Sequence, residues 1–195
     1  MLFRMKNYSE KLLFPLGLKI SNVKANTISI FGFIMAIIVF LGFTYNYLWV
    51  AILGLFFIEF FDQFDGVVAR IQGCTDFGGF LDSSLDRYGD ILVYYGLYVG
   101  GYVEVHLLIA VIAGSLLTSY TRARIEAARG GSVGGVGIFE RTDRIPFLML
   151  AAIIHLWYDQ ALFLGMIILA IGTNYTVFQR FRYASRTLSH IQNVD

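Results

Sequence analysis

Six long apolar runs constrain the fold of this chain more than any other feature of its sequence. Their approximate limits are 27–45, 48–69, 79–101, 105–124, 145–157 and 161–178. A helix needs about 20 mainly apolar residues to cross the hydrocarbon core of a bilayer, and the fifth run reaches that length only by borrowing flanking residues. Charged residues make up 15% of the chain, against about 25% in a soluble domain. The sequence therefore predicts an all-α integral membrane protein with six transmembrane helices.

The distribution of basic residues predicts the orientation of these helices. The loops at 45–47, 102–105 and 158–160 contain Glu104 and Asp159 but no Lys or Arg. All 15 Lys and Arg residues lie elsewhere. They fall in the N-terminal segment, in or next to the connections between the second and third runs and between the fourth and fifth runs, or after the sixth run. Cytoplasmic loops carry an excess of Lys and Arg. An even number of spans with both termini in the cytoplasm satisfies this pattern.

The N-terminal segment, residues 1–24, interleaves basic and apolar side chains. This pattern predicts an amphipathic juxtamembrane helix that lies on an anionic membrane surface, with a solvated tail as the alternative. Pro15 and Gly17 are expected to break that helix. Residues 25–195 are expected to form one membrane domain. The net charge of +1 gives no indication of a nucleic-acid partner.

Four aspartates interrupt the apolar pattern near the cytoplasmic ends of the second and third runs. They are Asp62, Asp65, Asp82 and Asp86. Spacings of three and four residues place the members of each pair on one face of a helix. Ionisable groups at membrane depth are costly and usually functional, and four carboxylates together repel one another. A solvated acidic patch at the interface is the alternative.

The aspartates require positive charge nearby, and Arg70 and Arg87 supply part of it. Hard divalent cations suit a site made only of oxygen ligands. Two Mg²⁺ ions would balance four carboxylates and still attract phosphate oxygens, with Mn²⁺ as the alternative. Gly66 and Ala69 share a face near these acids, where small residues allow either a ligand or a second helix to approach closely. Asp90, one turn beyond Asp86, is expected to hold Arg87 or to support the site.

The segment from Asp62 to Asp86 resembles the signature of the CDP-alcohol phosphotransferase family. That signature is D-x-x-D-G-x-x-A-R, followed after a short gap by G-x-x-x-D-x-x-x-D. All eight fixed positions match, and they are Asp62, Asp65, Gly66, Ala69, Arg70, Gly78, Asp82 and Asp86. The gap between Arg70 and Gly78 is seven residues, one fewer than is typical. The resemblance implies six spans, an N-terminal amphipathic helix and a homodimer.

The resemblance also implies roles for individual residues. Asp62, Asp65, Asp82 and Asp86 would bind two divalent ions, and Asp86 would also remove the proton of the acceptor hydroxyl. The residues implied to contact the CDP-lipid are Asn26, Ser29, Gly66, Arg70 and Thr75. Asn26 and Ser29 belong to a stretch similar to the P-N-x-I-T element of the family, with Ala25 in place of its proline. An N-cap for the first span is the alternative role for these two residues.

Three further elements resemble the branch that makes phosphatidylinositol phosphate or archaetidylinositol phosphate. They lie at 119–127, 137–144 and 179–180, and they contribute Arg122, Arg141 and Arg180. In that branch basic residues bind the phosphate of inositol phosphate. Arginine binds phosphate through a planar fork of donors. Positive-inside anchoring of the helices is the alternative role for these arginines.

The predicted function is metal-dependent transfer of a phosphatidyl-type group from a CDP-lipid to inositol phosphate, with release of CMP, in the plasma membrane. The active site would face the cytoplasm. The sequence leaves open whether the lipid is diacylglycerol or archaeol. Glycerol 3-phosphate is the alternative acceptor. A divalent-cation transporter is the alternative of another class, although transporters bind their ions near the bilayer midplane and these acids lie toward one face.

Overall fold

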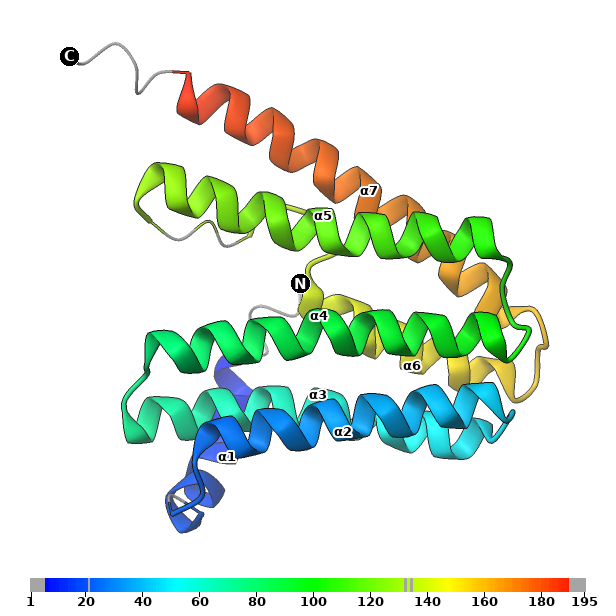
Figure 1. Ribbon diagram of the computed structural model, residues 1–195, viewed down its shortest axis with the longest axis horizontal. Coiled ribbons are helices and arrows are strands. Elements are labelled where there is room, and N and C mark those ends of the chain that lie inside the picture. The colour runs from blue at the N-terminus through cyan, green and yellow to red at the C-terminus, as the bar shows by residue number, and fades with distance from the viewer. Residues whose placement is uncertain (1–5, 21, 132, 134, 190–195) are drawn as a thin grey trace.

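The computed structural model describes residues 6–20, 22–131, 133 and 135–189, and this part of the chain is α-helical without strands (Figure 1). The helices are α1 (Lys6–Lys19), α2 (Ala25–Thr44), α3 (Leu48–Gln72), α4 (Asp76–Val99), α5 (Val105–Arg129), α6 (Arg141–His155) and α7 (Ala161–Leu188). Helices α2 to α7 correspond to the six apolar runs and alternate in direction along the chain.

Three of these helices, α2, α5 and α7, are long and apolar enough to cross a membrane by length and composition. The predicted all-α fold is therefore confirmed with three candidate membrane spans, and the count of six spans stays a prediction. Several helices extend beyond the apolar runs into polar sequence, so that α5 continues to Arg129 and α7 to Leu188. The extension of α7 carries Arg180 beyond the sixth apolar run, whereas Arg122 lies near the end of the fourth run.

Helix α1 continues through Pro15, so the predicted break at this position is wrong. A proline inside a helix removes one hydrogen bond and strains the preceding turn. Contact with α3 offsets this cost, because Gly17 is buried there and a Cβ at this position would lie 2.9 Å from Ile71 Cδ1. Gly17 is therefore a packing glycine rather than a helix breaker. Residues 1–5 of the predicted amphipathic segment lie outside the described residues.

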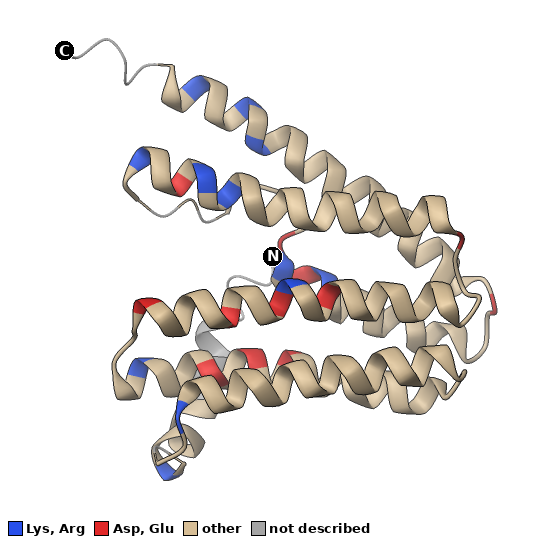
Figure 2. Ribbon diagram, in the orientation of Figure 1, with Lys and Arg blue, Asp and Glu red and all other residues tan. Residues whose placement is uncertain are grey.

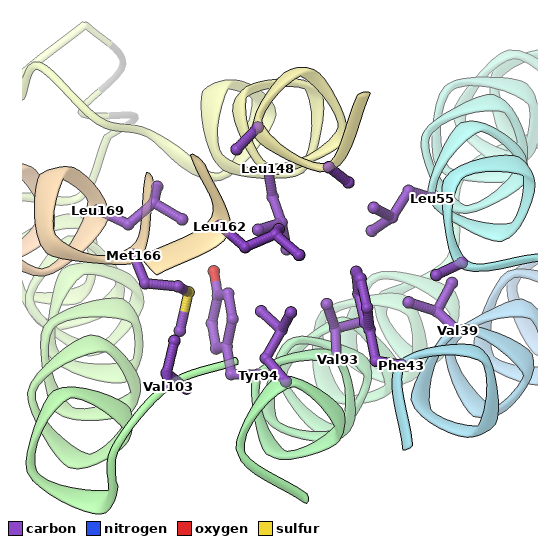
Figure 3. Close-up of a cluster of buried hydrophobic side chains, with 14 of the residues drawn as sticks. Val39, Phe43, Leu55, Val93, Tyr94, Val103, Leu148, Leu162, Met166 and Leu169 are labelled. Carbon is purple, nitrogen blue, oxygen red and sulfur yellow. The ribbon is translucent and has the colours of Figure 1, made fainter. Parts of the chain in front are cut away.

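Small residues allow α2 to pack closely against both α3 and α4. A Cβ on Gly96 of α4 would lie 2.9 Å from the backbone of Phe40, and one on Gly42 of α2 would lie 2.9 Å from the amide of Ala51. Close backbone approach of this kind drives helix association where apolar burial cannot. Side chains from these three helices and from α5, α6 and α7 then meet in a buried core around Tyr94 (Figure 3).

Helices α5 and α7 form a second closely packed pair that is joined by polar contacts. Thr118 Oγ1 donates to the carbonyl of Thr173 (3.2 Å), and Asn174 Nδ2 donates to the carbonyl of Ala110 (3.0 Å). Interhelical hydrogen bonds of this kind fix how one helix lies against another. They therefore determine where the polar extensions of α5 and α7 lie.

Figure 2 shows that Lys and Arg gather toward one end of the helices, whereas the loops that contain Glu104 and Asp159 lie at the opposite end. The aspartates of α3 and α4 lie on the basic side of the molecule. This arrangement agrees with the predicted charge asymmetry. The side of the membrane that each end faces stays a prediction.

Candidate active site

The structure brings three of the four predicted metal ligands together. Carboxylate oxygens of Asp62 from α3 and of Asp82 and Asp86 from α4 all lie within 4.8 Å of one another. The helical spacing thus places each side chain on the face that meets the neighbouring helix. Asp65 lies one turn after Asp62, and it lines a pocket together with Asp62 and Asp86. We call these four residues the carboxylate site.

Asp65 is held by a residue from a third helix. Ser29 Oγ of α2 donates a hydrogen bond to Asp65 Oδ2 at 2.6 Å and also approaches the carbonyl of Ala25. The Asp65 carboxylate is buried, so this bond fixes the orientation of a group that has little contact with solvent. Ser29 thus contacts the carboxylate site, although the sequence assigned it to the nucleotide.

The principal cation at the carboxylate site is Arg141, the first residue of α6. Its Nη1 donates to Asp62 Oδ1 at 2.6 Å, and its Nη2 forms an ion pair with Asp86. Arg87 lies farther away, with Nη1 3.7 Å from Asp86 Oδ2. The sequence analysis expected Arg70 and Arg87 to supply part of the positive charge and did not include Arg141, whose guanidinium joins α3 to α4.

The donor set of the carboxylate site fits a divalent cation. It consists of carboxylate oxygens, which magnesium and manganese prefer, and it includes no Cys or His ligand among the described residues. A pocket lined by Asp62, Asp65 and Asp86 also contains apolar side chains from α2, α3, α4 and α6. Low polarity around the acids strengthens their attraction for a cation.

The turn between α3 and α4 gathers residues that were predicted to contact the nucleotide. Thr75 is the N-cap of α4, and its Oγ1 accepts a hydrogen bond from Gly78 N at 3.0 Å. A Cβ on Gly78 would lie 2.9 Å from Thr75 Oγ1 and 3.1 Å from Asn26 Oδ1. The N-cap of α2 is Lys24, so the alternative role of Asn26 and Ser29 as helix caps is wrong. Gly78 instead leaves room for two polar side chains.

Gly66 is not required by helix packing. A Cβ at this position would meet only the guanidinium of Arg70, at 3.5 Å. The small-residue packing that the sequence offered as an alternative is therefore wrong at Gly66. The space over this glycine lies beside the exposed Arg70, where a ligand phosphate can approach the backbone.

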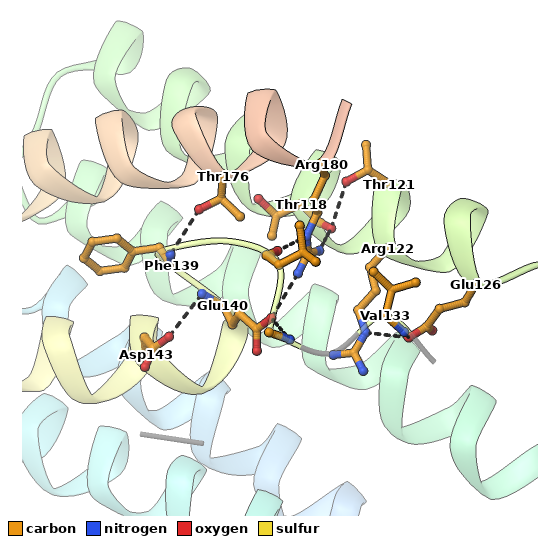
Figure 4. Close-up of polar contacts among 12 residues, drawn as sticks. Thr118, Thr121, Arg122, Glu126, Val133, Phe139, Glu140, Asp143, Thr176 and Arg180 are labelled. Carbon is orange, nitrogen blue, oxygen red and sulfur yellow. Dashed lines mark hydrogen bonds and ion pairs between the residues drawn. The ribbon is translucent and has the colours of Figure 1, made fainter. Parts of the chain in front are cut away.

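The other two predicted phosphate-binding arginines flank the loop between α5 and α6 (Figure 4). Arg122 Nε donates to Glu126 Oε1 at 3.0 Å, and the amide of Val133 donates to the same oxygen. Arg180 is 2% exposed. It donates to the carbonyls of Val136 (2.9 Å) and Thr118.

Arg180 also pairs with Glu140, the N-cap of α6. Glu140 and Asp143 form a capping box, in which the side chain of each residue accepts a hydrogen bond from the backbone N–H of the other. Arg180 thus anchors the loop that precedes Arg141. Of the three arginines, the structure brings only Arg141 into contact with the carboxylate site.

Sequence reasoning missed the partner of Asp90. Its carboxylate pairs with Arg144 of α6 at 3.2 Å rather than with Arg87. The spacing contained a signal, since Arg141 and Arg144 are three residues apart while Asp86 and Asp90 are four apart. Such spacings align two contacts between facing helices.

Comparison with known proteins places these features in a family. The family model for CDP-alcohol phosphatidyltransferase matches residues 22–178. Archaetidylinositol phosphate synthase of Methanothermobacter thermautotrophicus is 32% identical over 193 residues, which covers 96% of each chain. The synthase of the same name from Pyrococcus horikoshii is 35% identical over 130 residues, or 66% of each chain.

Solved structures agree with this match. The crystal structure of Mycobacterium tuberculosis phosphatidylinositol phosphate synthase with CDP-DAG bound is similar with a TM-score of 0.76 at 26% identity, and the match covers 88% of this chain and 92% of that one. A structure of the same protein in complex with manganese and citrate gives a TM-score of 0.75 at 27% identity, over 87% of each chain. The protein described here therefore belongs to the CDP-alcohol phosphatidyltransferase family and is a metal-dependent CDP-alcohol phosphotransferase.

Proposed function

We propose that this enzyme transfers a phosphatidyl-type group from CDP-diacylglycerol or CDP-archaeol to inositol phosphate and releases CMP. The observation that carries the proposal is the contact of Arg141 with Asp62 and Asp86. A cation suited to bind phosphate lies directly beside the carboxylate that is expected to act as the base. An acceptor that carries both a phosphate and a hydroxyl can use the two groups together.

The reaction requires one proton transfer and one displacement at phosphorus. Asp86 takes the proton of the acceptor hydroxyl, and the hydroxyl oxygen forms a bond to the phosphorus that carries the lipid. The bond between this phosphorus and the oxygen of CMP breaks, and CMP leaves with the electron pair. The products are a phosphodiester lipid, CMP and a proton, which passes from Asp86 to solvent.

Asp62, Asp65, Asp82 and Asp86 would hold the metal, for which we propose two Mg²⁺ ions with Mn²⁺ as a substitute. When bound, these ions polarise the pyrophosphate and neutralise the charge that develops on CMP. Ser29 keeps the Asp65 carboxylate in one orientation through its hydrogen bond. A fixed carboxylate loses less entropy when it binds a ligand.

The CDP portion of the lipid is proposed to bind along the start of α4. Thr75 and Asn26 both lie close to Gly78, and Gly66 leaves its backbone open beside Arg70. Arginine supplies a fork of donors to a phosphate. Together with Ser29, these are the residues that we assign to CDP-lipid binding.

The acceptor phosphate is proposed to bind Arg122, Arg141 and Arg180. Arg141 offers its guanidinium at the carboxylate site, and the side chain of Arg122 is 43% exposed. Arg180 uses its donors on the loop in this structure, so a direct phosphate contact by this residue requires those bonds to exchange. Glycerol 3-phosphate stays the alternative acceptor, because it also combines a phosphate with a hydroxyl.

The membrane arrangement is part of the proposal. Six helices would span a plasma membrane. The end that carries Lys and Arg, both termini and the carboxylate site would face the cytoplasm. Residues 25–195 would form the membrane domain, and two copies would form a homodimer. The charge asymmetry of the loops supports the orientation. Membership of a phosphotransferase family argues against the transporter alternative.

A CMP-release assay with a panel of acceptors tests this proposal. Purified protein in detergent receives Mg²⁺ and CDP-diacylglycerol or CDP-archaeol, with inositol 3-phosphate, glycerol 3-phosphate, free inositol or serine. We expect release with inositol phosphate and none with free inositol or serine. Release only with glycerol 3-phosphate would replace the proposed acceptor, and silence with every combination would refute the activity.

A further inference from the structure

A second ion pair lies one turn away from the contact between Arg141 and Asp86. Arg144 Nη2 lies 3.2 Å from Asp90 Oδ2, and the two side chains are 1% and 8% exposed. Arg144 follows Arg141 on α6, and Asp90 follows Asp86 on α4, at spacings that keep each pair on one helix face. Two arginine–aspartate contacts therefore join α4 to α6.

These contacts span helices whose main chains do not pack closely. Over the described residues, α6 packs against α3 and α7, and α4 packs against α2 and α5. Long arginine side chains bridge the remaining space between α4 and α6. The buried apolar residues Val93 and Ile145 line the same pocket as Asp90 and Arg141.

The energetics of such a pair favour a role in geometry. Removing one member of a buried ion pair strands the other charge and is strongly destabilising, whereas replacing both by neutral groups is far better tolerated. A buried pair therefore adds little net stability, but it penalises every arrangement in which its two charges separate. Here the penalised movement is a shift of α6 relative to α4.

We propose that Asp90 and Arg144 form a positioning pair that holds α6 in place, so that the guanidinium of Arg141 stays beside Asp62 and Asp86. Asp90 lines the pocket, but its charge is used by Arg144, so it is not a metal ligand. In this role neither residue would touch the substrate. The effect on the acceptor rests on the proposed function, whereas the effect on α6 does not.

The test compares four variants of the pair and one control variant, each in the whole chain. Arg144→Gln, Asp90→Asn and the double variant remove one charge or both, and Arg144→Lys keeps a cation for the case that Arg144→Gln does not fold. Asn174→Ala is the matched control, because it removes an interhelical hydrogen bond between α5 and α7. The readouts are the melting midpoint, amide hydrogen exchange of residues 141–145 and 147, and the KM values for acceptor, CDP-lipid and Mg²⁺.

We expect Arg144→Gln to speed exchange in the first turns of α6 and to raise the acceptor KM by about tenfold or more, with an unchanged CDP-lipid KM. Arg144→Lys should show the same changes to a smaller degree. The double variant should have a higher melting midpoint than Arg144→Gln or Asp90→Asn alone. Asn174→Ala should lower the melting midpoint without changing exchange in α6 or the acceptor KM.

Two results would overturn the inference. One is unchanged exchange in α6 for both Arg144 variants. The other is an increased Mg²⁺ requirement for Asp90→Asn but not for Arg144→Gln, which would make Asp90 a metal ligand. If the unmodified protein releases no CMP with any acceptor, the proposed function fails. Hydrogen exchange in α6 and the order of the melting midpoints would still decide the role of the pair.

Discussion

The four aspartates of the carboxylate site have different neighbours, although the sequence pattern treats them alike. Asp65 accepts a hydrogen bond from Ser29, and Asp62 and Asp86 share the guanidinium of Arg141. Asp86 is the member that contacts both Arg141 and Arg87. A carboxylate that lies beside two cations, one of them the proposed acceptor-binding residue, is well placed to receive a proton.

Replacing Asp86 with Asn should abolish turnover while the fold persists. The amide has the size of the carboxylate but cannot accept the proton, and the loss of a general base costs about 100- to 10,000-fold in rate. CMP release measures the effect, and gel filtration with the melting midpoint verifies the fold. Turnover within a few-fold of the unmodified enzyme would exclude Asp86 as the base.

Replacing Arg141 with Ala should mainly raise the KM for the acceptor. A hydrogen bond to a charged group contributes about 1.5–3 kcal/mol, which corresponds to about a tenfold to hundredfold change in binding. Steady-state kinetics with inositol phosphate as the varied substrate measures it. Arg129→Ala is the matched control, since Arg129 is an exposed arginine on the same side that pairs with Tyr183. Equal acceptor KM values in the two variants would reduce Arg141 to a membrane anchor.

At the scale of residues, the sequence predicted that aspartates of the second and third apolar runs come together, but it missed ion pairs between residues far apart in the chain. Helical periodicity was sufficient to place Asp82 with Asp86. The contact of Arg141 with Asp62 joins residues 79 positions apart, and no local pattern determines which helices become neighbours. The partner of Asp90 was missed for the same reason.

Among the elements, the connection from α3 to α4 depends on two glycines, Gly73 and Gly78. The chain leaves α3 through Gly73 at positive φ and enters α4 at Thr75. Gly78 then lies against Thr75 and Asn26. The seven residues between Arg70 and Gly78 are enough to form this turn, so the shortened gap does not disrupt the cap.

Replacing Gly78 with Ala should weaken CDP-lipid binding. The added Cβ would displace the Thr75 hydroxyl, which accepts the hydrogen bond from residue 78, and would crowd Asn26. Loss of one such interaction, about 1 kcal/mol, should raise the CDP-lipid KM by about fivefold. Gly79→Ala is the matched control, because no atom lies within 4 Å of its added Cβ. Similar KM values for both variants would contradict this role of Gly78.

The apolar runs of the sequence predicted where the helices lie, but they did not predict where the helices end. Apolar runs mark the part of a helix that prefers lipid, whereas α5 and α7 continue into polar sequence because their backbones stay hydrogen-bonded there. Helix α1 passes through Pro15 because packing of Gly17 on α3 offsets the local cost. Tertiary contact overrides a local propensity in that case.

For the whole molecule, the separation of charge is the feature that relates the fold to the membrane. Lys and Arg lie toward the end that contains the carboxylate site (Figure 2). The sequence predicted this asymmetry from loops alone, since charge counts require no knowledge of packing. The sequence could not predict which helices pack together, because an apolar helix face can contact lipid or another helix equally well.

The exposed and single Cys74 tests the predicted orientation. It lies in the turn before α4, on the side predicted to face the cytoplasm. A membrane-impermeant maleimide should label it in inside-out vesicles but not in intact spheroplasts. Tyr47→Cys in a Cys74→Ser background, at an exposed position of the opposite end, should show the reverse. Labelling of Cys74 from outside would invert the proposed topology.

The central claim is that a metal held by the aspartates of α3 and α4 drives transfer from a CDP-lipid to inositol phosphate. The most direct test measures CMP release by the purified enzyme before chelation with EDTA, after chelation, and after Mg²⁺ or Mn²⁺ is restored. We predict that release stops on chelation, returns with either cation, and requires inositol phosphate throughout. Release that persists after complete removal of metal would contradict the account.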